Sequence, residues 1–275
     1  RERAKRIPVQ YLTGKAWFMG YEFLVNSSVL IPRFDTEVLV EEAKKHIMPG
    51  CRLLDVCTGS GCILLSLLAE CKDRIAMAMG VDISKDALQV AIANGNRMEL
   101  PAQFRESDLF THVTGTYDVI VSNPPYIATG ELADLMPEVR DHEPVLALDG
   151  MEDGLYFYRK IVSQADGYLA QGGWLCFEIG YDQGAALKEM MTEAGYGQVQ
   201  IIKDLAEKGS VMAVSDVGVA VQFIRTALTG AVMNVYINTK SMKQRDEAEK
   251  INQKAEKLLE EGTKRADLVY EKVLS

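Results

Sequence analysis

The sequence predicts an α/β protein built on a doubly wound, mostly parallel sheet. Apolar runs alternate with helix-like stretches, a pattern typical of a parallel sheet covered by helices on both faces. A glycine-rich turn follows the first run directly, as in α/β domains that bind ligands at a strand-helix crevice. The strand-like runs are "CRLLDVC", "IAMAMGVDIS", "QFRESDLF", "YDVIVSN" and "GWLCFEIG", and the helix-like stretches include "GCILLSLLAECK", "KDALQVAIANGNRM" and "LYFYRKIVSQADGYLA".

Two elements are predicted ahead of this sheet. The segment "WFMGYEFLVNSSVLI" mixes aromatic and β-branched residues around "NSS", which indicates a β-hairpin turning there. From Glu37 to Ile47 the apolar residues recur at helical spacing, and Asp35 or Thr36 is expected to cap that helix. We expect a hairpin and linker over residues 1–30, the α/β domain over 31–214 and a helical tail over 215–275.

Composition disfavours several classes of protein. With 275 residues and 48% hydrophobic content, the chain is long enough for one large or two modest domains. Its net charge of −9 argues against direct binding of long nucleic acid, because such proteins usually carry a basic face. Five cysteines without CxxC spacing indicate reduced thiols in a cytoplasm. The chain opens on Arg1 without a signal peptide, so we expect it to begin inside a longer protein.

The first chemical signal is the glycine-rich turn in "LLDVCTGSGCILLSLL". Gly59 and Gly61 allow a tight turn and a close approach of the backbone to a ligand, and Asp55 stands where it could meet a charged group. Asp82, about 20 residues on, stands at the end of the next strand, where a carboxylate accepts ribose hydroxyls. In the alternative, the glycines only form a turn and Asp82 caps the next helix. A third glycine is missing, which disfavours a nicotinamide dinucleotide.

The second signal is "SNPPY" at the end of the fourth strand. Two prolines fix the backbone and remove two donors, so the corner cannot extend the sheet and holds Asn123 and Tyr126 in place. By itself Asn-Pro is a common turn opener. Together with the glycine-rich turn, the corner resembles a class I methyltransferase that uses S-adenosylmethionine on a planar amide or exocyclic amine. Asn123 and the carbonyl of Pro124 would accept the two amide hydrogens, and orientation of this kind contributes on the order of 7–11 kcal/mol.

Further motifs narrow this resemblance to one family. The stretches "QYLTGKAWFMGYEFLVNSSVLIPRFDTEVLVE", "DVCTGSG", "SNPPYI", "EPVLALDGMEDGLYFYRKI" and "FEIGYDQG" resemble the HemK/PrmC family, which methylates the glutamine of the Gly-Gly-Gln motif in peptide chain release factors. The resemblance covers about residues 8–214. It implies a seven-stranded sheet with one antiparallel strand, and a helical amino-terminal domain that helps to hold the release factor, of which residues 1–30 would be the remnant.

The resemblance also assigns roles to individual residues. For the substrate, it implies that Asn123 and Pro124 hold the glutamine amide while Pro125 and Tyr126 shape the slot. For the cofactor, it implies contacts to the methionine part, the ribose and the adenine edge from Asp55, Thr58, Gly59, Gly61, Asp82, Ile83, Asp108, Leu109 and Asn123. Two positions depart from the family. Leu109 stands where some members have an aromatic residue, and Cys57 stands where the family usually has glycine, so a positive φ there would be strained.

Two charged residues are candidates for the substrate slot. Arg33 in "IPRFDTE" would lie near the cofactor entrance together with Glu37, or this stretch would only cap and stiffen a helix start. Glu143 in "DHEPVLALDG" would edge the slot, or only stiffen a loop. No metal is expected, because the three histidines have no carboxylate or cysteine at ligand spacing and are expected on the surface or in loops.

The last 61 residues have a different character. They resemble the carboxyl-terminal part of the formiminotetrahydrofolate cyclodeaminase and methenyltetrahydrofolate cyclohydrolase family, a helical dimer. The apolar run 217–237 contains polar residues and is predicted to be a buried bundle helix rather than a membrane span. An apolar stripe at helical spacing follows, which would pack on the preceding helix or on a second copy of the chain: Ile251, Ala255, Leu258, Gly262, Ala266, Val269 and Val273.

These observations favour one function and leave three alternatives open. The expected reaction is methyl transfer from S-adenosylmethionine to the glutamine amide of a release factor. The alternatives are a glutamine methyltransferase for a ribosomal protein, a nucleic-acid amine methyltransferase, and an inactive cofactor-binding remnant. The acidic charge of the chain counts against a nucleic-acid substrate.

Overall fold

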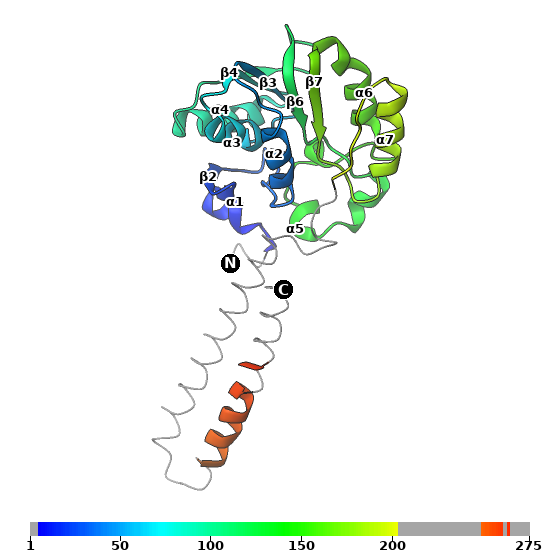
Figure 1. Ribbon diagram of the computed structural model, residues 1–275. Coiled ribbons are helices and arrows are strands. Elements are labelled where there is room, and N and C mark those ends of the chain that lie inside the picture. Colours follow the sequence, from blue (N-terminus) through cyan, green and yellow to red (C-terminus); the bar gives the residue numbers. More distant parts are fainter. Residues whose placement is uncertain (1–4, 203–248, 261–262, 265–275) are drawn as a thin grey trace. The chain divides into compact units, whose positions relative to one another are not determined.

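The computed structural model describes residues 5–202, 249–260 and 263–264. The chain divides into two compact units, residues 1–201 and 202–275. The first unit contains a five-stranded sheet and a separate two-stranded hairpin (Figure 1). In the second unit, residues 249–260 are helical, with Ala255 buried, which agrees with part of the predicted helical stripe. The predicted helix at 217–237 lies outside the described residues.

The sheet is parallel and doubly wound, as predicted. Its strand order is β5-β4-β3-β6-β7, and every neighbouring pair is parallel. The order runs outward from β3 in both directions, so the topological switch point lies between β3 and β6, where α/β proteins bind ligands. The strands are β3 (Cys51–Val56), β4 (Ile75–Asp82), β5 (Ala102–Glu106), β6 (Tyr117–Ser122) and β7 (Leu169–Phe177). A sixth and a seventh strand of this sheet were expected from the resemblance, and the segment predicted for the last of them, 204–214, lies outside the described residues.

Helices cover both faces of this sheet (Figure 1). On one face, apolar residues of α2 (Thr36–Lys44) and α3 (Cys62–Glu70) pack against Leu53 and Val119, and α4 (Lys85–Arg97) continues that layer over β5. On the other face, α6 (Tyr156–Ala165) packs against Leu54 and Ile120, and α7 (Gly184–Glu193) contacts α6. Successive residues of β3 and β6 point to opposite faces, which is why apolar residues stand next to one another in both strands, at Leu53 and Leu54 and from Val119 to Val121.

The hairpin consists of β1 (Lys15–Phe18) and β2 (Tyr21–Leu24), preceded by the short helix α1 (Val9–Thr13). Its turn is Met19–Gly20, with φ of 50° and 75°, and not "NSS", so the predicted position of the turn was wrong. Two successive positive φ angles match the two-residue turns that follow the twist of a hairpin, and Gly20 adopts one of them without strain. Phe18 and Phe23 are fully buried in the same core as α2 and α3, so the hairpin is part of the first unit.

Short segments connect β6 to β7 on the way to α6. They are the 3-10 helices Thr129–Asp134 and Val145–Ala147 and the helix α5 (Pro137–Arg140). A third 3-10 helix, Asp166–Tyr168, leads from α6 into β7. Asp35 occupies the N-cap position of α2 but its side chain makes no capping hydrogen bond, so the predicted cap is not formed there.

Candidate active site

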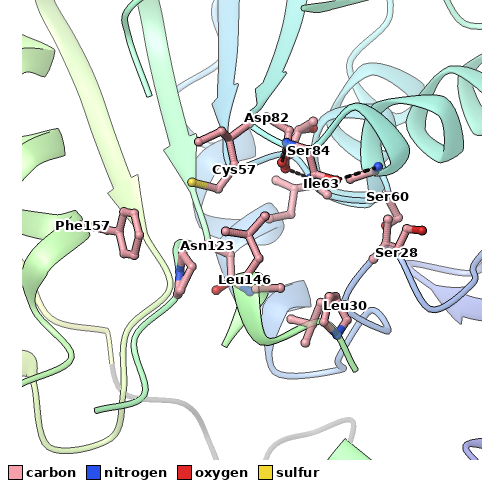
Figure 2. A pocket seen from close by; sticks show the side chains of 18 of the residues that line it. Ser28, Leu30, Cys57, Ser60, Ile63, Asp82, Ser84, Asn123, Leu146 and Phe157 are labelled. Atoms are coloured by element: carbon pink, nitrogen blue, oxygen red, sulfur yellow. Dashed lines mark hydrogen bonds between the residues drawn. The ribbon is translucent and has the colours of Figure 1, made fainter. Parts of the chain in front are cut away.

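A cavity of about 530 Å³ lies at the carboxyl ends of β3, β4, β5 and β6, next to the switch point (Figure 2). This volume is typical of sites for small molecules and cofactors. Each of these strands leads directly into residues that line the cavity, because parallel strands end at the same edge of the sheet. The predicted site residues that line it are Arg33, Thr58, Gly59, Asp82, Ile83, Asp108, Leu109, Asn123 and Pro125. Those that do not line it are Asp55, Gly61, Pro124, Tyr126 and Glu143.

The two glycines of the loop after β3 have different roles. Both have a positive φ, 54° for Gly59 and 78° for Gly61. A Cβ atom on Gly59 would meet no atom within 4 Å, whereas a Cβ on Gly61 would lie 3.2 Å from atoms of Ala91 and Leu65. Gly59 therefore leaves room beside the cavity, and Gly61 allows the start of α3 to pack closely on α4.

Asp55 lies beneath this loop and not on the cavity wall. Its side chain is fully buried, and its Oδ2 accepts a 2.6 Å hydrogen bond from the hydroxyl of Thr58, which does line the cavity. Burial raises the pKa of Asp55 to about 7, with a smaller contribution from the charge of Asp82, while the bond from Thr58 opposes the shift. The prediction placed Asp55 against the ligand, but in the structure it holds the loop that lines the cavity.

Asp82 projects its carboxylate at the cavity from the end of β4 (Figure 2). Its Oδ2 accepts from the amide of Gly59 at 2.8 Å, and its Oδ1 accepts from the amide of Ser84 at 2.9 Å. Burial raises the pKa of Asp82, and these backbone hydrogen bonds partly offset the shift. The alternative that Asp82 only caps the next helix is not needed, because the Ser84 hydroxyl caps α4 by accepting from the amide of Ala87.

The turn after β5 and the start of α6 also contribute to the cavity wall. Leu109 is buried, with a φ of 47°, and the hydroxyl of Ser107 fixes this turn by donating to the carbonyl of Leu109 at 2.7 Å. Ile83 and Asp108 also line this region. The prediction missed Phe157, which faces the cavity from α6 (Figure 2). The aromatic run "LYFY" is the only sequence signal for Phe157. It does not identify which of its rings faces a ligand, because helical periodicity does not distinguish between them.

Cys57 lines the cavity with its backbone in the left-handed region, at a φ of 63°. The sequence resembles a family that usually has glycine at this position, and from the sequence we expected strain here if φ were positive. The structure shows that φ is positive. A side chain in this region is strained, because Cβ approaches the following carbonyl group. Burial raises the pKa of the Cys57 thiol well above its ordinary value, so the thiol is protonated at neutral pH.

The corner after β6 presents Asn123 and Pro125 to the cavity, while Pro124 is buried and does not line it. The Nδ2 of Asn123 donates to the hydroxyl of Thr36 at 3.4 Å. The hydroxyl of Tyr126 donates to Oε1 of Glu178 at 3.4 Å, and burial raises the pKa of Tyr126 to about 12. The corner therefore places one amide side chain at the cavity and turns the tyrosine toward β7.

Three residues that the prediction missed support this corner from behind. Gln183 donates from Nε2 to the carbonyl of Tyr126 at 2.9 Å and accepts from the amide of Gly180 at 2.9 Å. Gly154 has a φ of 73°, and a Cβ there would lie 2.3 Å from the Tyr126 carbonyl oxygen. A Cβ on Gly150 would lie 2.8 Å from Tyr126 backbone atoms. The glycines of "DGMEDG" are thus required by the close approach of two backbone segments.

Arg33 and Glu143 form an ion pair beside the cavity. Glu143 is buried and accepts from the amide of Ile31 at 3.1 Å as well as from the Arg33 guanidinium. Only Arg33 lines the cavity, so Glu143 positions Arg33 and does not edge the slot itself. Glu37 likewise does not line the cavity: its Oε1 accepts from the amide of Met19 at 2.6 Å in the hairpin turn.

Asn94 connects the hairpin to the glycine-rich loop and was also missed. It is fully buried, its Oδ1 accepts from the amide of Leu24 at 2.7 Å, and its Nδ2 donates to the carbonyls of Leu24 and Ser60 at 3.1 and 2.9 Å. Ser60 lines the cavity. A buried side-chain amide with three bonds of this kind fixes two backbone segments relative to one another.

Within residues 5–202, 249–260 and 263–264, no group of three or more His, Cys, Asp or Glu side chains is arranged to hold a metal ion. His46 stacks on Trp174, with ring centroids 3.6 Å apart. In the same part of the chain, no helix has the length and apolar character needed to cross a membrane.

The fold and the cavity at its switch point define an α/β protein that binds a small molecule or cofactor at the carboxyl ends of its strands. Residues 32–138 match the family model described as Methyltransferase small domain. The solved structure of a methyltransferase from Pyrococcus furiosus superposes with a TM-score of 0.53 and 20% identity over 74% of this chain and 93% of that chain, which supports the fold.

Curated relatives give the particular family. The release factor glutamine methyltransferase of Geobacter sulfurreducens is 45% identical over 195 residues, covering 70% of this chain and 68% of the relative. That of Bacillus subtilis is 42% identical over 212 residues, covering 74% of this chain and 73% of the relative. The chain belongs to the release factor glutamine methyltransferase family. Residues 183–257 in addition match the model described as Formiminotransferase-cyclodeaminase, which overlaps the tail predicted to resemble such a protein.

Proposed function

We propose that this protein transfers a methyl group from S-adenosylmethionine to the side-chain amide nitrogen of the glutamine in the Gly-Gly-Gln motif of a peptide chain release factor, in the cytoplasm. One observation carries the proposal: Asn123 and Asp82 line the same cavity, so a side-chain amide suited to hold the substrate amide and a carboxylate suited to hold a ribose face one space. Family membership supports the choice of substrate.

The cavity fits the cofactor in chemistry and size. Each Asp82 oxygen accepts one backbone hydrogen bond and keeps a lone pair, which suits the two neighbouring hydroxyls of a ribose. Leu109 and Ile83 offer apolar contact to an adenine, and Gly59 leaves the loop open for the methionine part. When bound, S-adenosylmethionine supplies an electrophilic methyl group.

The protein's own contribution is to orient a weak nucleophile. An amide nitrogen is unreactive because its lone pair is delocalised into the carbonyl. The Oδ1 of Asn123 and the carbonyl of Pro124 would accept the two amide hydrogens and aim the nitrogen into the cavity, while Pro125 and Tyr126 confine the flat group. No base is needed beforehand, because the nitrogen releases one proton to water once it is alkylated.

The test is to incubate the purified protein with S-adenosylmethionine labelled in the methyl group and a release factor. Beside it stand a release factor with Gly-Gly-Ala in place of Gly-Gly-Gln, and an Asn123→Ala enzyme. Asn96→Ala is the matched control, because Asn96 is exposed on α4. We expect label only on the Gly-Gly-Gln factor, and a loss of at least 100-fold in rate for Asn123→Ala, which corresponds to about 2.7 kcal/mol.

Calorimetry of cofactor binding separates the ways in which this test fails. No label on any factor, with cofactor bound normally, would overturn the proposed substrate. Equal label on the Gly-Gly-Ala factor would show that another residue is modified. Full activity of Asn123→Ala would remove the proposed role of the corner after β6.

A further inference from the structure

Glu178 stands immediately beside the substrate-binding corner and has no role in the reaction proposed so far. It follows β7 as Asn123 follows β6, and the two strands pair with Ser122 opposite Phe177. The amide of Glu178 donates to the carbonyl of Ser122 at 3.1 Å, which continues the ladder by one step. The register therefore brings the side chains of Asn123 and Glu178 to the same edge of the sheet.

Three side chains with donor groups surround the Glu178 carboxylate. The Tyr126 hydroxyl donates to Oε1 at 3.4 Å. Burial raises the pKa of Glu178, and hydrogen bonding from Thr36, Asn123 and Tyr126 partly offsets that shift. Even so, Oε2 is buried without a hydrogen bond of ordinary geometry in the described part of the chain. The contact from Tyr126 is long, as is common for catalytic hydrogen bonds before the substrate is bound.

The chemistry of these groups decides which way the Asn123 amide faces. An asparagine presents a donor at Nδ2 and an acceptor at Oδ1, and only the acceptor can receive the hydrogens of a substrate amide. Nδ2 of Asn123 already donates to the Thr36 hydroxyl at 3.4 Å. Because the Thr36 oxygen accepts this hydrogen bond, the single proton of the hydroxyl is free to be donated to Glu178. When Glu178 is ionised its carboxylate only accepts, and in that state it fixes the direction of the whole chain of hydrogen bonds.

We propose that Glu178 is a positioning residue which, together with Thr36, holds the Asn123 amide with Nδ2 turned inward and Oδ1 toward the substrate. Glu178 thereby selects an amide, which offers two hydrogens, over a carboxylate, which offers none. This inference rests on the proposed function, because it assigns a preference to the same site.

The position of Thr36 supports this role over a purely structural one. It is the first residue of α2 and almost fully buried, at 3% exposure, and its hydroxyl faces Asn123 instead of solvent.

The main test is Glu178→Gln, which keeps the shape of the side chain but adds a donor group. In this variant only one of the two terminal side-chain atoms at position 178 accepts hydrogen bonds, and the other one donates. We therefore expect Asn123 to turn over and to offer Nδ2, in place of Oδ1, to the substrate. We expect kcat for the Gly-Gly-Gln release factor to fall at least 10-fold, while the dissociation constant of the cofactor changes less than twofold. Glu189→Gln makes the same chemical change at an exposed position of α7 and serves as the control.

The specificity of the site gives a readout that a structural defect would not move. A release factor carrying Gly-Gly-Glu is used as a competitive inhibitor. We expect weak inhibition of the wild-type enzyme and at least 10-fold stronger inhibition, relative to the Gly-Gly-Gln factor, of Glu178→Gln. An unchanged kcat together with an unchanged ratio of inhibition to KM would overturn the inference while leaving the proposed function intact.

The Thr36 hydroxyl is tested by a pair of variants. Thr36→Val removes it and is expected to lower kcat about as much as Glu178→Gln, whereas Thr36→Ser keeps it and should remain within threefold of the wild type. Equal activities of the two variants would contradict the role of the hydroxyl.

A measurement without the substrate keeps the inference independent of the activity. In nuclear magnetic resonance spectra of nitrogen-15-labelled protein, the side-chain amide hydrogens of Asn123 are assigned by comparison with Asn123→Ala. We expect them to exchange slowly with solvent in the wild type and at least 10-fold faster in Glu178→Gln. Fast exchange in both proteins would overturn the inference, whether or not the release factor is methylated.

Discussion

The two halves of the site are assembled in different ways. On the cofactor side, the loop after β3, Asp82 and the turn at Leu109 come from three consecutive strand ends, within residues 55–109. On the substrate side, the corner at Asn123–Tyr126 depends on Thr36, on the glycines of "DGMEDG" and on Gln183, which come from three separate segments. The first half is encoded locally, and the second exists only when the whole unit has folded. Substitutions at four positions test this contrast.

The largest expected effect is on the cofactor side, at Asp55. Its pKa is raised from an ordinary value near 3.8 to about 7 by burial. Between these values the folded protein holds a proton that the unfolded chain has lost, so the free energy of unfolding falls as pH rises from about 4 to 7, by about 4 kcal/mol in total. Urea unfolding of cofactor-free Asp55→Asn should lack this part of the pH dependence, and the variant should be more stable than the wild type at pH 8.

The exposed Asp73→Asn is the control for charge removal, and it should keep the wild-type slope. Asp82 and Glu178 have raised pKa values as well, and they contribute a remaining slope of the same sign in both proteins. An Asp55→Asn variant with the full wild-type slope would show that Asp55 is ionised in the folded protein at pH 6.

The next effect is on the substrate side, at Gly154. An alanine there would place Cβ 2.3 Å from the Tyr126 carbonyl oxygen at a φ of 73°, so the corner must move. We expect Gly154→Ala to lose about 3 kcal/mol of stability and more than 10-fold in kcat, with cofactor affinity kept. Thermal unfolding, methyl transfer and calorimetry measure the three quantities.

Gly167→Ala is the matched control, because a Cβ there meets nothing within 4 Å and φ is not positive. If Gly154→Ala weakened the cofactor as much as it slowed transfer, the two halves of the site would not be independent, and the contrast drawn here would fail.

A smaller effect is expected from Asp82→Asn. The substitution removes the charge that favours two ribose hydroxyls and places a donor beside the amides of Gly59 and Ser84, which Asp82 now satisfies. We expect cofactor affinity to fall 10- to 100-fold, or about 1.4–2.7 kcal/mol, measured by calorimetry. The same affinity in Asp82→Asn and in Asp73→Asn would show that Asp82 does not contact the cofactor.

The smallest effect concerns backbone strain at Cys57. At a φ of 63° a glycine is unstrained and a β-branched residue is strained most. We expect Cys57→Gly to be at least as stable as the wild type and Cys57→Val to be about 1 kcal/mol less stable, by urea unfolding. The reverse order would mean that packing of the side chain outweighs the strain at this position.

The fold was predictable wherever hydrophobic pattern and burial agree. The five strands and the helices α3, α4 and α6 lie at the stretches inferred from apolar periodicity, and β3, β4, β6 and the three helices each bury a set of residues that this periodicity defines. The hairpin turn was placed wrongly at "NSS". Met19 is an unusual residue for a positive φ, and its amide is held by Glu37 from α2, a tertiary contact that no local pattern records.

Site residues were predictable where they directly follow a strand, and they were missed where they contact segments far away in the sequence. The sequence indicated Gly59, Asp82 and Asn123, which line the cavity, because each follows a strand directly. It did not indicate Asn94, Gln183 or Glu178, whose side chains act across the sheet on backbone or side chains far away in sequence. Amide and carboxylate residues are common on surfaces, so only the folded structure distinguishes those that are buried for a purpose.

Gln183 also bears on where the methyltransferase could be separated from the rest of the chain. It is the first residue of the range that matches Formiminotransferase-cyclodeaminase, yet its side chain holds the carbonyl of Tyr126 in the methyltransferase. The family model therefore assigns this residue to Formiminotransferase-cyclodeaminase, whereas the resemblance of "FEIGYDQG" and the hydrogen bond to Tyr126 assign it to the methyltransferase. A cut made at the start of that match would remove a support of the catalytic corner, so a transplantable methyltransferase has to retain at least Gln183.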